Sequence, residues 1–178
     1  MNTKDWAGWL KLDLHDDAEI VTLVERCAEF ALAMKAEAHP RWITILGNSG
    51  TGKTHCARRL WKMLEHKCGY SPDLNYNPSE IYWPLLVSQM RGGDYSQYHD
   101  AIRWRGLFLD DIGAERDPNG FAAEQLNTLL GCRENKWTIL TSNLTLGQIG
   151  KIDPRMADRI IRRPNIFIEV NTKSHSLR

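Results

Sequence analysis

Long apolar runs are missing from this sequence. No stretch approaches the roughly 18 consecutive apolar residues that a membrane span needs. The first five residues, Met1 to Asp5, do not begin an apolar segment of the kind a secretory signal requires. We therefore expect a cytoplasmic protein without membrane attachment. Of the 178 residues, 42% are hydrophobic and 25% are charged. This ordinary globular mixture excludes a wholly disordered or collagen-like protein.

Cysteine is also scarce, and internal repeats and low-complexity linkers are absent. The four cysteines form no C-x-x-C pair and match no zinc-binding spacing, so we expect reduced, partly buried thiols: Cys27, Cys56, Cys68 and Cys132. The length suits one domain with a core of its own. We expect a short apolar arm over residues 1–15 and a single domain over residues 16–178.

Charge of one sign does not dominate, because the formal net charge is only +1. Its distribution is nevertheless uneven. Residues 1–40 hold four basic against eight acidic side chains, whereas residues 133–178 hold nine basic against four acidic. Such asymmetry suits head-to-tail self-association or a nucleic-acid-binding face, and a plainly solvated surface remains the alternative.

Short apolar, β-branched runs alternate with segments of helical periodicity. The runs predict strands over residues 42–46, 107–109, 137–141 and 166–170, with a further short strand around 74–76. The periodic segments predict helices over residues 18–34, 53–68, 80–91, 121–130, 146–149 and 154–161. This alternation indicates an α/β fold with a mainly parallel, five-stranded sheet flanked by helices.

A glycine-rich loop follows the first predicted strand and opens a predicted helix. It fits G-x-x-x-x-G-K-[ST], the P-loop of nucleotide-binding proteins, at every fixed position. In such a loop the backbone N–H groups surround phosphate oxygens, the lysine faces the β- and γ-phosphates, and the last hydroxyl binds Mg²⁺. We predict a site for ATP and Mg²⁺ that consists of Gly47, Asn48, Ser49, Gly50, Thr51, Gly52, Lys53, Thr54 and the next residue, His55.

Two adjacent carboxylates end the second main strand. Parallel α/β sheets bind ligands at the carboxyl ends of their strands, so Asp110 and Asp111 are expected beside the P-loop. We assign Asp110, with Thr54, to Mg²⁺ and Asp111 to the attacking water. Paired carboxylates repel each other, which itself favours a nearby cation. An acidic turn without function is the alternative.

One amide and a row of arginines follow. Asn143 ends the third main strand, where its amide can reach the γ-phosphate or the attacking water; an Asx turn is the alternative. Arg155, Arg159 and Arg162 share one helix face. A guanidinium supplied to a neighbour's γ-phosphate is an arginine finger. A solvated basic face is the alternative, and it is the preferred interpretation for Arg162 and Arg163.

These motifs resemble the DnaC/IstB group of AAA+ ATPases, which belongs to the initiator clade with DnaA. The strings that carry the resemblance are Gly47–Thr54, Leu107–Gly113, Thr138–Leu144 and Asp158-Arg159. The resemblance covers about residues 18–178. It implies an AAA+ core, here without a C-terminal helical lid and without the N-terminal helicase-binding domain of most loaders.

The resemblance also implies roles. Asp110 and Asp111 correspond to Walker B, Asn143 to sensor 1, Arg159 to the arginine finger with Arg155 as second choice, and Arg178 to the sensor 2 arginine. The segment Glu80–Arg91 corresponds to the region that faces single-stranded DNA in the family. Aromatic candidates for base stacking are Tyr82, Trp83 and Tyr98, with core packing as the alternative for Trp83.

The expected function is that of an ATP-hydrolysing AAA+ protein of DNA replication initiation. The implied partners are copies of the same chain assembled head to tail, single-stranded DNA and, as a candidate, a replicative helicase. An IstB-like transposition helper is the alternative within the group. Outside it, the alternatives are a small P-loop kinase and a scaffold that binds ATP but scarcely hydrolyses it.

Overall fold

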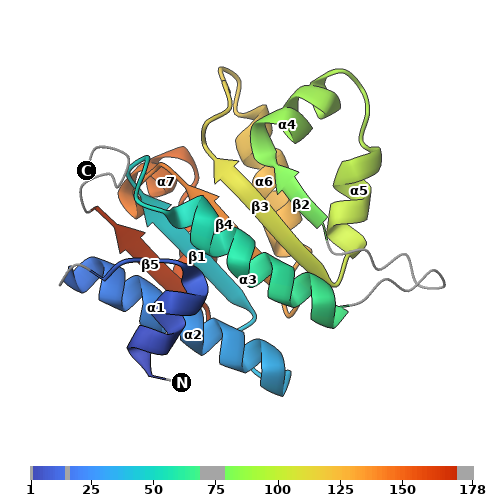
Figure 1. Cartoon of the computed structure of the whole chain (residues 1–178). Coiled ribbons are helices and arrows are strands. Elements are labelled where there is room, and N and C mark those ends of the chain that lie inside the picture. The colour runs from blue at the N-terminus through green and yellow to red at the C-terminus, as the bar shows by residue number, and fades with distance from the viewer. Residues whose placement is uncertain (1, 15–16, 69–78, 172–178) are drawn as a thin grey trace.

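The computed structural model describes residues 2–14, 17–68 and 79–171. Its centre is a sheet of five strands in the order β2-β3-β4-β1-β5, and every pairing between them is parallel (Figure 1). The strands are β1 (Trp42–Gly47), β2 (Ser79–Tyr82), β3 (Gly106–Ile112), β4 (Trp137–Ser142) and β5 (Ile166–Val170). This confirms the α/β class and the mainly parallel five-stranded sheet.

Helices cover both faces of the sheet. One face carries α1 (Thr3–Leu10), α2 (Ala18–Ala36) and α3 (Lys53–Cys68). The other carries α4 (Trp83–Arg91), α5 (Ser96–Arg103), α6 (Phe121–Gly131), α7 (Leu146–Ile152) and α8 (Pro154–Ile161). The central strands β1 and β4 are buried on both faces, which is why they read as continuous apolar runs in the sequence.

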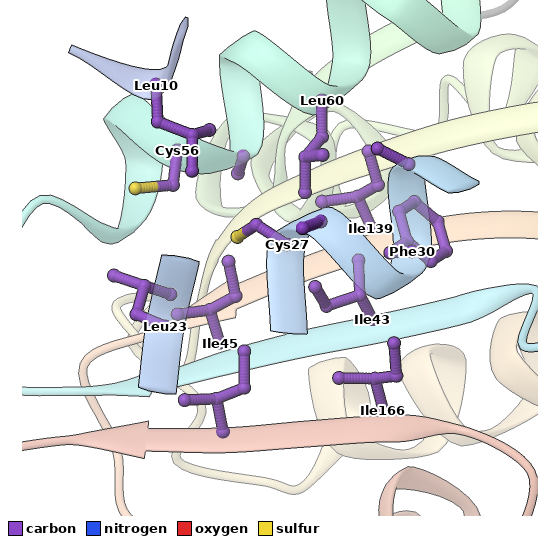
Figure 2. Close-up of a cluster of buried hydrophobic side chains, with 14 of the residues drawn as sticks. Leu10, Leu23, Cys27, Phe30, Ile43, Ile45, Cys56, Leu60, Ile139 and Ile166 are labelled. Carbon is purple, nitrogen blue, oxygen red and sulfur yellow. The ribbon is translucent and has the colours of Figure 1, made fainter. Parts of the chain in front are cut away.

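Figure 2 shows the core on the first of these faces. Ile43 and Ile45 of β1 meet Leu23 and Phe30 of α2 and Leu60 of α3, all of them fully buried. Helix α2 begins at an N-cap residue: the side chain of Asp17 accepts hydrogen bonds from two backbone N–H groups in the first turn of the helix. Packing in this core therefore fixes the position of α3 relative to β1, and with it the loop that connects the two.

The arm expected over residues 1–15 contains a helix that joins this core. The side chain of Asn2 caps α1, and Trp6, Ala7 and Leu10 are buried against α2 and α3. Apolar residues on one helical face explain this packing. Among the described residues, nothing forms a second domain beyond the sheet and its two helix layers, and none of their helices is long and apolar enough to cross a membrane.

The prediction of one helix over residues 80–91 is wrong at its beginning. Ser79–Tyr82 is the strand β2, paired in parallel with β3, and helix α4 begins only at Trp83. Pro84 occupies the first turn of α4, the place in a helix where proline is tolerated because no N–H is needed there. The strand suggested around residues 74–76 lies outside the described residues.

Candidate nucleotide site

The loop between β1 and α3 can be built only with glycine at its first position. Gly47 has φ +128°, and a Cβ placed on it would come 1.8 Å from the backbone oxygen of Val170 on β5. Gly52, with φ +87°, lies immediately before α3. Within the loop the Thr51 hydroxyl donates to the backbone oxygen of Asn48, at 3.0 Å. The predicted P-loop therefore has the strand-loop-helix context that its chemistry requires.

Lys53 lies at the start of α3 with only 5% of its surface exposed. Its Nζ donates to the backbone oxygen of Asn48 at 2.5 Å and to Oδ1 of Asn143 at 3.0 Å. Burial lowers the pKa of Lys53, and the negative charges of Asp111 and Asp110 partly oppose that shift. The ammonium is thus a desolvated cation, whose attraction for an anion is stronger than in water.

Asp110 is held by hydroxyl groups from two sides. The Thr54 hydroxyl donates to its Oδ1 at 2.9 Å, and the Thr141 hydroxyl of β4 donates to the same oxygen at 2.5 Å. The Asp110 residue is 6% exposed. Thr54 and Asp110, the two residues predicted to hold Mg²⁺, are therefore in direct contact.

Asp111 reaches the same cleft because β3 is irregular there. In a regular strand, adjacent side chains point to opposite faces. The register between β3 and β4 shifts between Leu109 and Ile112, and Asp111 adopts φ +63°. Its N–H donates to the Thr141 hydroxyl at 3.0 Å, and the Asn143 amide donates to its Oδ1 at 2.6 Å. The bulge thus brings both carboxylates to one place.

Asn143 links the two halves of the site. Its amide oxygen accepts from Lys53 while its amide nitrogen donates to Asp111. An isolated Asx turn would use the side chain on nearby backbone groups instead. The geometry gives Asn143 contact with both the phosphate-facing cation and the water-facing carboxylate of the predicted mechanism.

A cleft of about 690 Å³ opens over these groups. Its size lies within the range of small-molecule sites. It is lined by the predicted residues Ser49, Gly50, Gly52, Lys53, Thr54, His55, Asp110, Asp111 and Asn143, with Thr141 and Ser142 of β4.

Three lining residues, Lys11, Leu12 and Asp13, were not anticipated from the sequence. They follow α1, and the ring Nε2 of His55 makes a 2.7 Å hydrogen bond to the backbone oxygen of Leu10. No motif marks these positions; only the docking of α1 brings them here.

A salt bridge lies beside Asp110. Nε of Arg58, one turn after Thr54 on α3, donates to Oε1 of Glu80 on β2 at 2.7 Å. Nη2 of the same side chain lies 3.7 Å from Oδ2 of Asp110. The hydrogen bond to Glu80 is the main cause of a raised pKa of Arg58. The Tyr82 hydroxyl donates to Oδ2 of Asp111 at 3.4 Å.

The residues present fit a magnesium ion of the kind P-loop proteins use. The Thr54 hydroxyl and the Asp110 carboxylate offer oxygen ligands, which Mg²⁺ prefers. Among the described residues, no group of three or more His, Cys, Asp or Glu side chains could hold a metal ion. A magnesium ion here would therefore depend on nucleotide oxygens and water for its remaining ligands.

The predicted arginines lie away from this cleft. Arg159 on α8 contacts Oε1 of Glu134 at 3.2 Å and Oδ1 of Asn127 at 3.4 Å. Glu134 precedes β4, so this group lies at the amino ends of the strands, opposite the P-loop. Arg155 is bonded to Asp153 at 2.8 Å. The structure does not bring either arginine to Lys53 within one chain, and Arg178 lies outside the described residues.

Two of the three candidate stacking residues are buried. Trp83 is fully enclosed, and Tyr98 is 4% exposed with its hydroxyl donating to the backbone oxygen of Gln125. The expectation that Tyr98 could stack on a base is therefore wrong, because α5 turns it against α6. Tyr82 is half exposed, as is Leu85 one turn of α4 further on.

Comparison with known proteins gives a result at the level of structure only. No family model matches the sequence, and no curated protein matches it. Among solved structures, DnaI superposes with a TM-score of 0.66 and 22% identity, covering 94% of this chain and 92% of that one. The DnaC helicase loader superposes with a TM-score of 0.65 and 20% identity, covering 87% of this chain and 92% of that one.

The initiator DnaA is a further structural neighbour. DnaA from Aquifex aeolicus bound to AMPPCP gives a TM-score of 0.60 and 20% identity, covering 86% of this chain but 47% of that one. The present chain therefore spans about half of DnaA. The resemblance drawn from the motifs is confirmed for the fold: the chain folds like DnaI, the DnaC helicase loader and the matching part of DnaA.

Proposed function

We propose that this chain binds ATP with Mg²⁺ and hydrolyses it slowly, and that nucleotide couples to head-to-tail assembly with copies of itself. The observation that carries the proposal is the connected network in the cleft. Lys53 contacts Asn143, Asn143 contacts Asp111, and Thr54 contacts Asp110. A chance P-loop match would give no reason for these five residues, from α3, β3 and the end of β4, to meet.

Each group has a distinct role in this proposal. Lys53 and the loop N–H groups bind the phosphates. Thr54 and Asp110 hold Mg²⁺, which when bound offsets phosphate charge and orients the γ-phosphate. Asp111 orients the attacking water, accepting its hydrogen bond and then its proton. Asn143 senses the γ-phosphate because it contacts both Lys53 and Asp111.

The position of Arg159 supports assembly. At the amino ends of the strands it is remote from the nucleotide cleft of its own chain, so a role in hydrolysis requires a second copy. The uneven charge of the chain favours such contacts, with its acidic excess in residues 1–40 and its basic excess in residues 133–178. ATP that bridges two copies would couple nucleotide state to assembly.

The biological role proposed is helicase-loader-like, in replication initiation. DnaI and the DnaC helicase loader are similar over most of both chains, and a further neighbour is the initiator DnaA bound to AMPPCP and single-stranded DNA. Single-stranded DNA and a replicative helicase are the proposed partners, with DNA meeting the α4 region near Tyr82. The small-kinase alternative requires an arginine-rich lid over the phosphates, whereas Arg159 and Arg162 lie at the opposite ends of the strands, against Glu134.

The test of the nucleotide site is calorimetric titration of ATP with Mg²⁺ into the wild-type protein and into Lys53→Ala. Wild type should bind, and the variant should lose binding because the phosphate counter-charge is gone. Lys62→Ala is the matched control, an exposed lysine on the same helix, and should bind like wild type. Circular dichroism checks that all three are folded. Equal ATP affinity in wild type and Lys53→Ala would contradict the assignment.

A further inference from the structure

We propose that Arg58 competes with the magnesium ion for Asp110, and that Glu80 reduces this competition by holding Arg58 away. The pair would thereby set how strongly Mg²⁺ reinforces nucleotide binding. This inference rests on the proposed ATP–Mg²⁺ function and adds to it two side chains outside the P-loop and Walker motifs.

The geometry places Arg58 between two carboxylates at unequal distances. It follows Thr54 by four residues on α3, so both side chains lie on the same face of the helix. Its Nε donates a 2.7 Å hydrogen bond to Glu80, whereas its Nη2 is 3.7 Å from Oδ2 of Asp110. The second distance is too long for a hydrogen bond but short enough for attraction between charges. Arg58 is therefore bound to Glu80 and only attracted by Asp110.

The two oxygens of Asp110 have different neighbours. Oδ1 accepts from the hydroxyls of Thr54 and Thr141, and Oδ2 faces the guanidinium of Arg58. A cation held by this carboxylate would have a second positive charge beside it, and like charges disfavour each other. The Asp110 side chain is 8% exposed, so solvent screens this repulsion less than it would on an open surface.

Glu80 is fixed where it can counter this effect. It belongs to β2, which is hydrogen-bonded beside β3, and its register partner is Phe108, two residues before Asp110 (Figure 1). Its carboxylate offsets the charge of Arg58 and supplies the shorter contact. Without that charge, Asp110 becomes the nearer acidic partner of Arg58. The guanidinium would then move toward Oδ2 and weaken the site for Mg²⁺.

The experiment measures binding of a fluorescent ATP analogue by anisotropy, once in excess Mg²⁺ and once in EDTA. The readout is the magnesium ratio, defined as the dissociation constant in EDTA divided by the dissociation constant in excess Mg²⁺. This ratio isolates what the metal contributes to binding. The set is wild type, Glu80→Gln, Arg58→Gln and the double variant. The matched control is Arg59→Gln, at the next position of α3, where the side chain lines a groove with Trp6 and Trp9 instead.

Glu80→Gln should lower the magnesium ratio about three- to tenfold, as expected for one partly exposed charge pair. Arg58→Gln should leave the ratio at or above the wild-type value, and the double variant should return to within about twofold of wild type. Arg59→Gln should match wild type. The distinctive result is that Arg58→Gln suppresses the effect of Glu80→Gln. If the two substitutions merely damaged the site, their effects would add up in the double variant.

Two results would overturn the inference. A double variant no better than Glu80→Gln alone would show that Arg58 does not mediate the effect. A threefold or greater drop in Arg58→Gln would show that Arg58 supports the metal site; this arm decides the matter even if Glu80→Gln fails to fold. A wild-type protein that binds no ATP analogue would instead refute the proposed function and the inference together.

Discussion

At the carboxyl ends of the strands, polar side chains from α3, β3 and the end of β4 hydrogen-bond one another inside one cleft, whereas at the amino ends Arg159 of α8 and Arg162, which follows α8, share the carboxylate of Glu134 near the surface. Lys53 and Asp110 are 5% and 6% exposed. Arg162 pairs with Asp158 and Glu134 through side chains that are more than half exposed. The polar groups at the carboxyl ends therefore contact one another inside a cleft, whereas Arg159 and Arg162 pair with a carboxylate that is mostly exposed.

This contrast separates what one copy can do from what needs two. An exposed ion pair contributes little to stability. A contribution to stability therefore explains the arginines of the α8 region poorly. If Arg159 serves a neighbouring copy, then removing it should affect turnover far more than folding.

The largest effect is expected at the amino ends, for Arg159→Ala. If Arg159 reaches a neighbour's γ-phosphate, ATP turnover should fall by roughly 10³–10⁵, while ATP affinity stays near wild type. Stability should change by less than about 1 kcal/mol, because the bond to Glu134 is at the surface. The measurement is steady-state ATPase activity against protein concentration, with Arg162→Ala as the control, since Arg162 follows α8 and contacts the same Glu134 oxygen.

Complementation distinguishes a neighbour's arginine from one that acts in its own chain. A 1:1 mixture of Arg159→Ala and Lys53→Ala should regain activity, since one mixed interface joins an intact P-loop to an intact arginine. A turnover that is unchanged in Arg159→Ala would mean that the residue is a surface ion pair. Loss without rescue, together with activity proportional to protein concentration, would refute head-to-tail assembly.

The next effect belongs to the carboxyl ends, for Asp111→Asn. The amide cannot accept the proton of the attacking water, so turnover should fall by roughly 10²–10⁴. Binding of ATP with Mg²⁺ should persist, because Asp110 and Thr54 remain. Asp110→Asn is the contrasting variant, and it should lose the magnesium dependence of binding as well. Wild-type turnover in Asp111→Asn would remove this residue from its assigned role.

The sequence was most informative where the chemistry is contiguous. The P-loop lies within eight consecutive residues, and Asp110 and Asn143 lie toward the carboxyl ends of two apolar strands, so their place beside the loop follows from parallel topology. The short strand β2 was missed because its four residues were read as the start of the helix behind it. Pro84 is the signal that could have placed the boundary.

Contacts between distant segments could not be predicted in this way. Residues 11–13 reach the cleft because α1 docks on α2 and α3, and nothing in their own sequence marks them. The bulge that turns Asp111 into the cleft, and the Arg58–Glu80 pair beside it, depend on the register of β3 and β2. Such features arise from tertiary packing, and a single sequence carries no local pattern for them.

A stability effect at the amino ends comes third, for Arg133→Met. Arg133 is fully buried and donates to the backbone oxygens of Ala101, Trp104 and Trp137 and to the Thr138 hydroxyl. Methionine would leave these acceptors buried without donors, so the free energy of unfolding should drop by about 2–4 kcal/mol. Chemical denaturation measures it, with exposed Arg26→Met as control. An unchanged midpoint would show that Arg133 does not join α5 to the sheet.

The smallest effect concerns the pH dependence of stability at Lys53. Burial lowers its pKa in the folded protein below the value of 10.5 that an exposed lysine has. The folded state then binds this proton less tightly than the unfolded state does, so the unfavourable contribution of the buried charge is fully present below the lowered pKa. As pH rises from there through 10.5, the contribution disappears and the stability attributable to Lys53 increases. Thermal unfolding of wild type and Lys53→Met should therefore differ by an amount that moves in favour of wild type as pH rises through the lowered pKa toward 10.5, by no more than a few degrees. Lys62→Met, which removes an exposed lysine from the same helix, should show no such trend. A constant difference between the unfolding temperatures of wild type and Lys53→Met across this range would mean that Lys53 is not desolvated. The charge at the carboxyl ends of the strands would then be solvated much like the arginines at the amino ends.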